Sequence, residues 1–429
     1  MNDKITEIKS NVSDDKYFFV KHSSGLPIFI YPKPGYNSSY AIIGTRYGSI
    51  NTTFEADGKL IKVPDGIAHY LEHKLFESED GDAFSKYAKT GASANAFTSF
   101  DETCYLFSCT QNFEESLKIL LDLIQSPYFT KEGVEKEQGI IGQEIRMYDD
   151  DPDLCLMYNL FNALYHNHPL KIDIAGTVES IREITPEKLY ECYNAYYNLH
   201  NMVLCVVGDL DVNKVLKVAD ENLRSTKKVE VENIFPEEPD SIVTKRIEQN
   251  FEISVKMFKI GFKESAGKER ASVKQMVCTD ILLEAFSSTF SPLYYELMKK
   301  NLINTASFDG KYLEGPGYRS IIFSGESKDP DKVCEIIKEY ADKLHENLID
   351  KDTFEIVRKS VYGKYMASLN STEIIGIEMV NGYFSGASPF DYLDCIKSVT
   401  LDDVNKRLEE ELLSDKCALS VVSPLKGDS

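Results

Sequence analysis

The first half of the chain contains several short apolar runs that favour strands. "LPIFIYPKPGYNSSYAIIGTRYGS" holds two β-rich runs, and Pro32, Pro34 and Gly35 between them indicate a turn. "ASANAFTSFDETCYLFSCT" alternates apolar and polar residues, which predicts a half-buried strand. "NMVLCVVGDLD" is a continuous apolar run closed by turn residues and predicts a buried strand.

Helical patterns lie between these runs. "DAFSKYAKTG" is helical and is closed by Gly91. A longer helical stretch covers roughly residues 112–148. "ITPEKLYECYNAYY" places Thr185 at the N-cap and Pro186 at the first helical position, with an apolar stripe behind them. Strands and helices therefore both contribute to this half of the chain.

The second half repeats this order after a polar segment. "RSTKKVEVENIFPEEPDSIVTKRIEQ" carries two prolines and many charges, which indicates a linker on the surface. Strand-like "FEISVKMFKIGFKES", long helices around "DKVCEIIKEYADKLHENL" and a final buried run, "CALSVVSPL", follow it. We therefore predict an α+β protein with two similar domains, each a mainly antiparallel β-sheet packed with helices. The domains should span residues 1–225 and 246–429, joined by a linker at residues 226–245.

Size and charge agree with this organisation and narrow the range of partners. The chain has 429 residues, too many for one hydrophobic core. Its 48 basic and 69 acidic residues give a net charge of −21. Such a surface repels phosphate backbones and anionic lipids, so we expect neither nucleic acid nor membrane as a partner. A cationic peptide would be attracted instead.

The apolar segments and the cysteines indicate a cytoplasmic protein. No run of about 18 apolar residues is present, and the N-terminal "MNDKITEIKSNVSDDKY" lacks the apolar segment of a signal peptide. The nine cysteines are scattered, and none forms a CxxC pair. We expect them to be reduced and mostly buried thiols.

The segment "GIAHYLEHKLFES" carries the main chemical signal. On a helix, His69 and His73 lie four residues apart and share one face, so both imidazoles can reach one ion. Glu72 lies beside that face, within reach of a water on the ion. Imidazole and carboxylate suit Zn²⁺, and a catalytic zinc needs three protein ligands and one open position. A third ligand is therefore expected elsewhere in the chain.

A later helix offers the best candidates for that ligand. In "GVEKEQGIIGQEIRMYDD", Glu137 and Glu144 are seven residues apart and point from one side of the helix. The apolar Ile140, Ile141 and Ile145 suggest that this helix is substantially buried, so the carboxylates need a partner. In the second half, Val357 and Lys364 occupy the corresponding positions, so only one half retains the chemistry.

A simpler interpretation must be weighed against the metal site. Two histidines on a helix often mark an ordinary polar face, and an HxxEH pattern arises by chance. The spaced glutamates favour the metal site over that interpretation. His166 and His168 in "YHNHP" lack a nearby carboxylate pair and precede a proline, so we interpret them as loop residues.

These motifs resemble the pitrilysin/insulinase type of zinc metallopeptidase, whose signature is HxxEH. "PDGIAHYLEHKLF", "GASANAFTSFDETCYLF", "VEKEQGIIGQEI" and "AGTVESIREITPEKLYECYNAYYNLHNMVLCVVGDLD" all read like that family, in its order. The length is similar to the half-length branch that includes the mitochondrial processing peptidase and bacterial relatives. In that branch two subunits close around a substrate chamber.

The resemblance implies a role for each residue. His69, His73 and Glu144 would bind Zn²⁺, Glu72 would be the general base and Glu137 would be the supporting second glutamate. Asn95, Ala96 and Phe97 would belong to an edge strand onto which an extended peptide substrate adds through main-chain hydrogen bonds. The implied reaction is metal-assisted peptide hydrolysis.

One stretch departs from the family pattern. Members that work alone or as homodimers carry an Arg and, seven residues later, a Tyr in the second domain. "SPLYYELMKKNLINTASF" has Met298 and Thr305 at those positions. We therefore expect a homologous partner subunit to supply the pair, in a heterodimer, with a homodimer as the other possibility.

Two other functions remain open. The chain could be a non-catalytic peptide-binding or scaffold subunit, although it retains the His and Glu positions that a degenerate copy does not need. It could also be a structural zinc protein, but such sites usually have four ligands and favour cysteine, and no cysteine adjoins the motif.

Overall fold

The computed structural model describes residues 5–79 and 81–425. They form two compact units, and each is assembled from separate segments of the chain. Unit 1 comprises the chain up to Ile145, Asp173–Ile234 and Ala367–Phe390. Unit 2 comprises Arg146–Ile172, Phe235–Met366 and the chain from Asp391.

Unit 1 is built on a seven-stranded sheet with the order β1-β2-β3-β11-β4-β10-β9. Neighbouring strands are antiparallel except β3 and β11, which are parallel. The strands of this sheet are β1 (Ile5–Lys9), β2 (Lys16–Lys21), β3 (Pro27–Pro32), β4 (Ser39–Thr45), β9 (Ser93–Thr98), β10 (Thr103–Cys109) and β11 (Met202–Gly208). Smaller sheets contain β5 (Thr53–Ala56), β6 (Lys59–Lys62) and β12 (Val231–Asn233), and β7 (Glu77–Ser78) with β8 (Gly81–Asp82).

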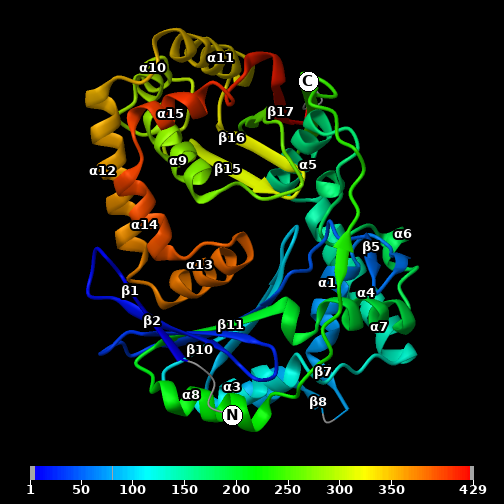
Figure 1. Ribbon diagram of the computed structural model, residues 1–429. Helices are drawn as coiled ribbons and strands as arrows, with labels where there is room; N and C mark the ends of the chain where they lie inside the picture. Colours follow the sequence, from blue (N-terminus) through cyan, green and yellow to red (C-terminus); the bar gives the residue numbers. More distant parts are fainter. Residues whose placement is uncertain (1–4, 80, 426–429) are drawn as a thin grey trace. The chain divides into compact units, whose positions relative to one another are not determined.

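Helices cover both faces of this sheet. Helix α13 packs on β4 and β11 from one side, and α3 and α8 lie on the other (Figure 1). The helices of unit 1 are α1 (Ile67–Leu75), α2 (Ala83–Thr90), α3 (Phe113–Leu123), α4 (Lys131–Asp149, ending in unit 2), α6 (Val178–Ile181), α7 (Pro186–Tyr196), the 3₁₀ turn η2 (Leu199–Asn201), α8 (Val212–Asn222) and α13 (Thr372–Ser385).

Unit 2 repeats this architecture around a five-stranded sheet with the order β13-β17-β14-β16-β15. Its strands are β13 (Arg246–Phe251), β14 (Met257–Lys263), β15 (Asp309–Gly315), β16 (Tyr318–Glu326) and β17 (Cys417–Pro424). Its helices are α5 (Pro152–Leu164), η1 (Pro169–Lys171), α9 (Val273–Ser287), α10 (Pro292–Lys299), α11 (Pro330–Asn347), α12 (Lys351–Ser368), α14 (Pro389–Ser398), α15 (Leu401–Leu408) and η3 (Ser414–Lys416).

The two buried runs that the sequence singles out hold equivalent places. In unit 1, β11 lies between β3, to which it is parallel, and β4, to which it is antiparallel. In unit 2, β17 lies in the same way between β13 and β14. Both strands are almost wholly buried, because helices cover both faces of each sheet. The predicted pair of similar α+β domains is therefore confirmed.

Each unit contains one helix that comes from the other half of the chain. Helix α5 comes from the first half of the chain and packs on β14 and β17 of unit 2, whereas α13 comes from the second half and packs on unit 1. The domain boundaries expected at residues 225 and 246 assume that each domain is one continuous segment of the chain. They remain a prediction. Within the expected linker, Val231–Asn233 forms β12 and pairs with β5.

Two predicted elements are each divided in the structure. The expected single strand over "ASANAFTSFDETCYLFSCT" is a hairpin, because the N–H of Ser99 donates to the carbonyl of Glu102 and turns the chain between β9 and β10. The expected helix at 112–148 is two helices, α3 and α4, separated by "IQSPYFT" with Pro127.

Ile140 was expected to be buried in α4, but it is 46% exposed, whereas Ile141 and Ile145 are buried.

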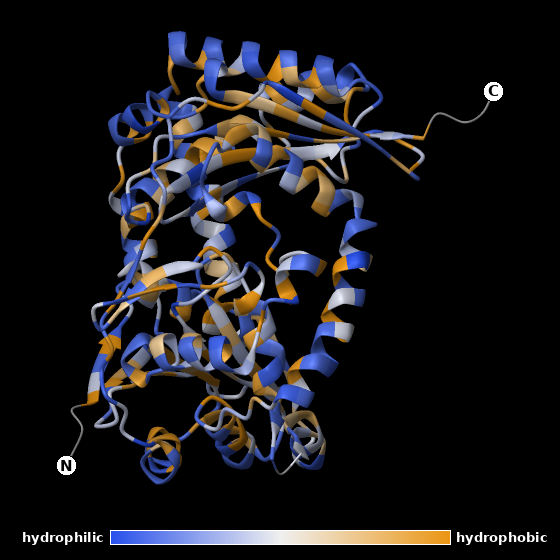
Figure 2. Ribbon diagram, turned by 90° about the vertical axis from the view of Figure 1, so that its right-hand side faces the viewer, coloured by the Kyte–Doolittle hydropathy of each residue, from blue (hydrophilic) through white to orange (hydrophobic). Residues whose placement is uncertain are grey.

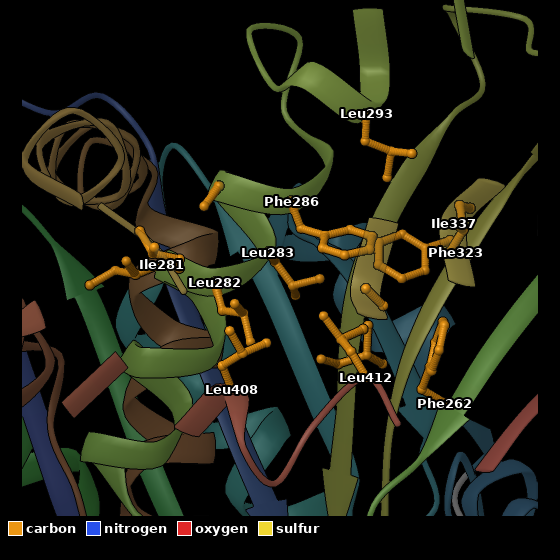
Figure 3. Packing of buried hydrophobic residues seen from close by; sticks show 14 of the residues in the cluster. Phe262, Ile281, Leu282, Leu283, Phe286, Leu293, Phe323, Ile337, Leu408 and Leu412 are labelled. Carbon is orange, nitrogen blue, oxygen red and sulfur yellow. The ribbon is translucent and has the colours of Figure 1, made fainter. Parts of the chain in front are cut away.

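A hydrophobic core lies between the sheet of unit 2 and its helices. Figure 3 shows Phe286 of α9 and Phe323 of β16 facing one another, and their ring centroids are 5.0 Å apart. Coloured by hydropathy, the helices carry alternating polar and apolar segments along their length, as expected for helices with one buried face (Figure 2).

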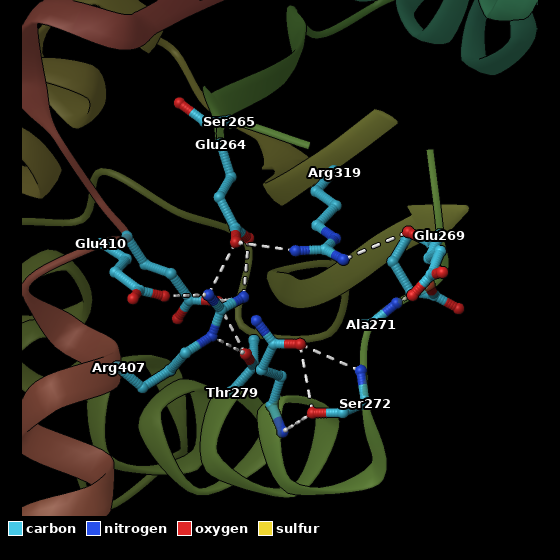
Figure 4. Close-up of polar contacts among 12 residues, drawn as sticks. Glu264, Ser265, Glu269, Ala271, Ser272, Thr279, Arg319, Arg407 and Glu410 are labelled. Carbon is cyan, nitrogen blue, oxygen red and sulfur yellow. Dashed lines mark hydrogen bonds and ion pairs between the residues drawn. The ribbon is translucent and has the colours of Figure 1, made fainter. Parts of the chain in front are cut away.

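A buried ionic network also stabilises unit 2. Both terminal nitrogens of Arg407 in α15 donate hydrogen bonds to the carboxylate of Glu264, at 2.6 Å each. Arg407 also forms an ion pair with Glu411 at 2.6 Å. Its Nε donates to Thr279 of α9 (Figure 4). All four residues are less than a tenth exposed, so the network ties α15 and α9 to the end of β14.

All nine cysteines are free, and six of them are buried, as expected from the sequence. Among the described helices, none combines the length and the apolar composition that crossing a bilayer requires.

Candidate metal centre

Helix α1 carries the HxxEH motif and begins at a constrained glycine. Gly66 has φ 86°, a left-handed conformation that side chains disfavour. A Cβ at this position would lie 2.3 Å from the carbonyl oxygen of Ala175, so the backbone leaves no room for one. The first turn of α1 is thereby packed against the loop that precedes α6. All of α1 except His73 is buried.

The two histidines of α1 meet one glutamate of α4. His69 Nε2 lies 3.9 Å from Glu144 Oε1, and His73 Nε2 lies 3.5 Å from Glu144 Oε2. One donor atom from each residue lies within 4.8 Å of the other two. A tetrahedral ion with bonds of about 2.0–2.1 Å needs donor atoms about 3.4 Å apart, close to the 3.5 Å between His73 and Glu144 and shorter than the 3.9 Å between His69 and Glu144. Among the described residues, this is the one group of three such donors that could hold a metal ion.

The second glutamate of α4 orients one of these imidazoles. His73 Nδ1 lies 3.0 Å from Glu137 Oε1, so Nδ1–H donates to the carboxylate. In the neutral imidazole, Nε2 then presents a lone pair toward Glu144 Oε2. Two acceptors that face one another need a cation or a proton between them. This donor set therefore fits Zn²⁺, with His73 held in the tautomer that a metal requires.

Burial and charge set the protonation of these groups. Burial, together with the neighbouring His73, lowers the pKa of His69 to about 4, so its imidazole is neutral and available to a metal at neutral pH. Burial also lowers the pKa of His73, but the hydrogen bond to Glu137 and the charges of nearby glutamates outweigh it and leave the pKa above its usual value. For Glu137, burial raises the pKa, and the interaction with His73 outweighs it and keeps the pKa low.

Glu72 lies beside the metal group and has its own partner. It is 8% exposed, and the hydroxyl of Thr98 donates to its Oε2 at 2.6 Å. Burial raises the pKa of Glu72 above its usual value, which brings a carboxylate closer to the basicity that a general base needs. Thr98 is the last residue of β9, so this bond joins the motif helix to that strand.

Strand β9 is the edge of the large sheet, with β10 as its one neighbour in the described sheet. Asn95, Ala96 and Phe97 lie in the middle of β9, and Asn95 is exposed. An edge strand offers unpaired backbone groups to which an extended chain can add. The three residues of the predicted substrate strand therefore lie on an edge strand. This strand ends at Thr98, which donates a hydrogen bond to Glu72 of α1.

Family models and a close relative decide the classification. The model "Insulinase (Peptidase family M16)" matches residues 62–178, and the model "Peptidase M16 inactive domain" matches residues 183–361. YmfH of Bacillus subtilis, named an uncharacterized zinc protease, is 39% identical over 430 residues that cover 98% of this chain and 99% of YmfH. The chain belongs to peptidase family M16. The predicted resemblance to pitrilysin and insulinase is thus confirmed.

Solved M16 structures share the fold over the whole chain. The crystal structure of an M16-like peptidase from Alicyclobacillus acidocaldarius has 33% identity and a TM-score of 0.90, with 99% of both chains covered. Pitrilysin has 18% identity and a TM-score of 0.75 over 98% of this chain and 46% of its own. At that identity the likeness concerns the fold alone.

The second M16 unit has an ion pair where the sequence predicts the loss of the carboxylates. Lys364, the counterpart of Glu144, lies on α12 with its Nζ 2.6 Å from Glu284 Oε2 of α9. Ser360 donates to the other oxygen of Glu284 at 2.6 Å. Val357, the counterpart of Glu137, is fully buried. Glu284 is thus neutralised by a lysine at this position.

The other residues noted in the sequence have these positions. His168 is buried and is the N-cap of η1. His166 Nε2 lies 3.2 Å from the hydroxyl of Ser241. Both histidines therefore take part in local structure. Met298 lies on α10 and is 39% exposed, and Thr305 follows in the turn after α10.

Sequence reasoning missed two polar partners. The pattern of "GASANAFTSFDETCYLF" predicts no role for Thr98, although its hydroxyl donates to Glu72. Lys74 follows His73 directly, is fully buried and pairs with Glu77. Lys74 is a charged residue within the apolar pattern of α1, and this alone could have indicated that it needs a buried partner. For Thr98 no local signal exists, because the contact spans 26 residues.

Proposed function

We propose that this chain is a zinc-dependent endopeptidase that hydrolyses peptides or small unfolded proteins. The observation that supports it best is the convergence of His69, His73 and Glu144, with Glu72 beside them. His69, His73 and Glu144 would hold Zn²⁺. When bound, the ion would polarise the scissile carbonyl and lower the pKa of a water molecule.

The residues of the chain have separate tasks in this proposal. Glu72 accepts the proton of the attacking water and passes it to the leaving amine. Glu137 holds His73 in the tautomer that leaves Nε2 free for the ion. The edge strand β9 binds the peptide main chain through Asn95, Ala96 and Phe97, so many sequences can be accommodated. The net charge of −21 favours cationic peptides.

We further propose that the active form is a heterodimer that encloses a chamber. Met298 and Thr305 stand where members that work alone or as homodimers carry Arg and Tyr, and neither side chain can replace a guanidinium or a phenol. A homologous subunit with both residues would supply them. The isolated chain should then be a weak peptidase. Peptide turnover by the pure chain at a rate typical of competent enzymes would contradict the heterodimer but not the zinc site.

The second candidate is a non-catalytic subunit that binds peptides on β9 or holds a complex together. The exposed edge of β9 favours it as much as it favours a peptidase. Metal content separates the two functions. We expect about one zinc per chain in protein purified without chelators, and a marked loss in Glu144→Gln. Glu135→Gln changes an exposed glutamate of the same helix and should keep its zinc. Absence of zinc from the wild type would favour the scaffold function.

A further inference from the structure

The hydroxyl of Thr98 connects two parts of the site that are distant in sequence. It donates to Glu72 Oε2 at 2.6 Å. Thr103, its direct partner on β10, has its hydroxyl 3.4 Å away and donates its own proton to the carbonyl of Tyr47 at 2.8 Å. Because an ionised carboxylate only accepts, Thr98 must be the donor in its bond to Glu72.

The alternation of side chains along β9 shows which face of the strand carries this contact. Side chains alternate along a strand, so Thr98 and Ala96 face one side of the sheet, together with their partners Thr103 and Tyr105. Tyr105 contacts Phe76 at the end of α1, with ring centroids 5.9 Å apart. Helix α1 therefore lies on the Thr98 face of β9. Among the described residues, β9 pairs with no strand besides β10, and the N–H of Ala96 donates to Oδ1 of Asn95.

We propose that Thr98 is a positioning residue that fixes the carboxylate of Glu72 relative to the peptide-binding edge of β9. This inference rests on the proposed peptidase function. A peptide that pairs with β9 lies about one strand spacing, roughly 4.8 Å, beyond it. The Thr98 hydroxyl sets Glu72 at a defined place along that edge. Since Oε2 is engaged by Thr98, Oε1 is the oxygen that accepts the proton.

The valine and serine variants of Thr98 separate positioning from packing. Thr98→Val keeps the shape of the side chain and removes the hydroxyl, whereas Thr98→Ser keeps the hydroxyl and removes a methyl group. We expect kcat for a peptide to fall about 10–100-fold in Thr98→Val with KM changed less than about twofold, since a misplaced base affects the chemical step rather than binding. Thr98→Ser should stay within about threefold of the wild type.

A second readout does not depend on turnover. The wild type and both variants, loaded with zinc, are titrated by calorimetry with a tripeptide hydroxamate, whose hydroxyl proton a nearby carboxylate accepts. We expect about tenfold weaker binding in Thr98→Val and recovery in Thr98→Ser. Thr45→Val is the matched control, because Thr45 of β4 also donates a buried hydroxyl bond, to the carbonyl of Tyr196. It should bind the hydroxamate like the wild type.

The outcomes distinguish this inference from the proposed function. A wild type that binds no zinc overturns both. Zinc-loaded proteins in which Thr98→Val binds the hydroxamate as tightly as the wild type overturn the role of Thr98 alone. The same holds if Thr98→Ser is as impaired as Thr98→Val, since packing would then explain the loss. Loss in the valine variant with recovery in the serine variant, at equal zinc content, supports the inference.

Discussion

Nδ1 of His73 lies 3.0 Å from Oε1 of Glu137, and the two residues come from different helices, 64 positions apart in the chain. The bond fixes which nitrogen of His73 carries the proton and which faces Glu144. It also gives a hydrogen-bond donor to Glu137, whose side chain is buried and only 6% exposed. One contact thus prepares a ligand for the ion and makes the burial of a carboxylate acceptable.

Removal of Glu137 should weaken the metal site without abolishing it. We expect Glu137→Ala to lower zinc affinity about 10–100-fold, since outer partners of metal-bound histidines have effects of this size. Glu137→Gln keeps an acceptor for Nδ1–H and should lose less. Zinc affinity is measured by competition with a chromophoric chelator. Glu135→Ala, on the exposed face of the same helix, is the control. Equal affinities for Glu137→Ala and the control would exclude this role.

Two glycines with similar positive φ angles should respond differently to alanine. Gly66 has φ 86° and Gly58 has φ 82°. Nothing lies within 4 Å of a Cβ at Gly58, whereas at Gly66 it would lie 2.3 Å from the carbonyl oxygen of Ala175. Gly58→Ala should cost about 1–2 kcal/mol from conformation alone. Gly66→Ala should cost about 1–3 kcal/mol more through the clash, and should weaken zinc binding as α1 shifts. Thermal unfolding and zinc titration of both variants test this, and similar losses would refute it.

The buried network of unit 2 predicts a large effect at Arg407. Arg407→Met would leave Glu411 buried without its cation and Glu264 with Arg319 alone, 3.6 Å away. We expect it to lower the free energy of unfolding by about 3–5 kcal/mol. Its neighbour Lys406 pairs with Asp402, and their side chains are 68% and 76% exposed. Lys406→Met should therefore change stability by about 0.5 kcal/mol or less. Denaturant unfolding that finds the two variants alike would contradict the assignment.

Acid should destabilise the fold through His168. Burial lowers the pKa of His168 to about 4, and its two nitrogens bond to Leu170 N–H and to the carbonyl of Pro316. The unfolded chain takes up a proton near pH 6.5, whereas the folded chain does not until about pH 4, so stability falls as pH falls through this window. Between pH 7 and pH 5 the loss from this residue should be about 2 kcal/mol.

The variant His168→Asn tests this pH dependence. Asparagine can accept the same Leu170 N–H bond as an N-cap but does not titrate. Unfolding of His168→Asn should therefore be less sensitive to pH between 7 and 5 than that of the wild type. His200→Asn, which removes an exposed histidine, controls for the loss of an imidazole and should keep the dependence of the wild type. Unchanged pH dependence in His168→Asn would rule out His168 as the source.

Much of the fold could be predicted from the sequence, because its signals are local. The N-cap at Thr185 and the stop at Gly91 depend on residues within one helical turn, and both are found as expected. The runs that form β11 and β17 are mostly apolar because each strand is covered on both faces. The spacing of His69 and His73 places them on one helical face wherever that helix packs.

The tertiary structure decided which distant residues meet. The choice of Glu144 to face both histidines, and of Glu137 to orient His73, depends on how α4 packs against α1. No pattern near Glu72 indicates that Thr98 donates to it. The exchange of α5 and α13 between the units likewise has no local signature. The sequence by itself determined the elements and the chemistry that each one carries. Packing over long sequence separations determined the site, because hydrogen bonds and metal donor sets depend on distances in space that short-range periodicity does not fix.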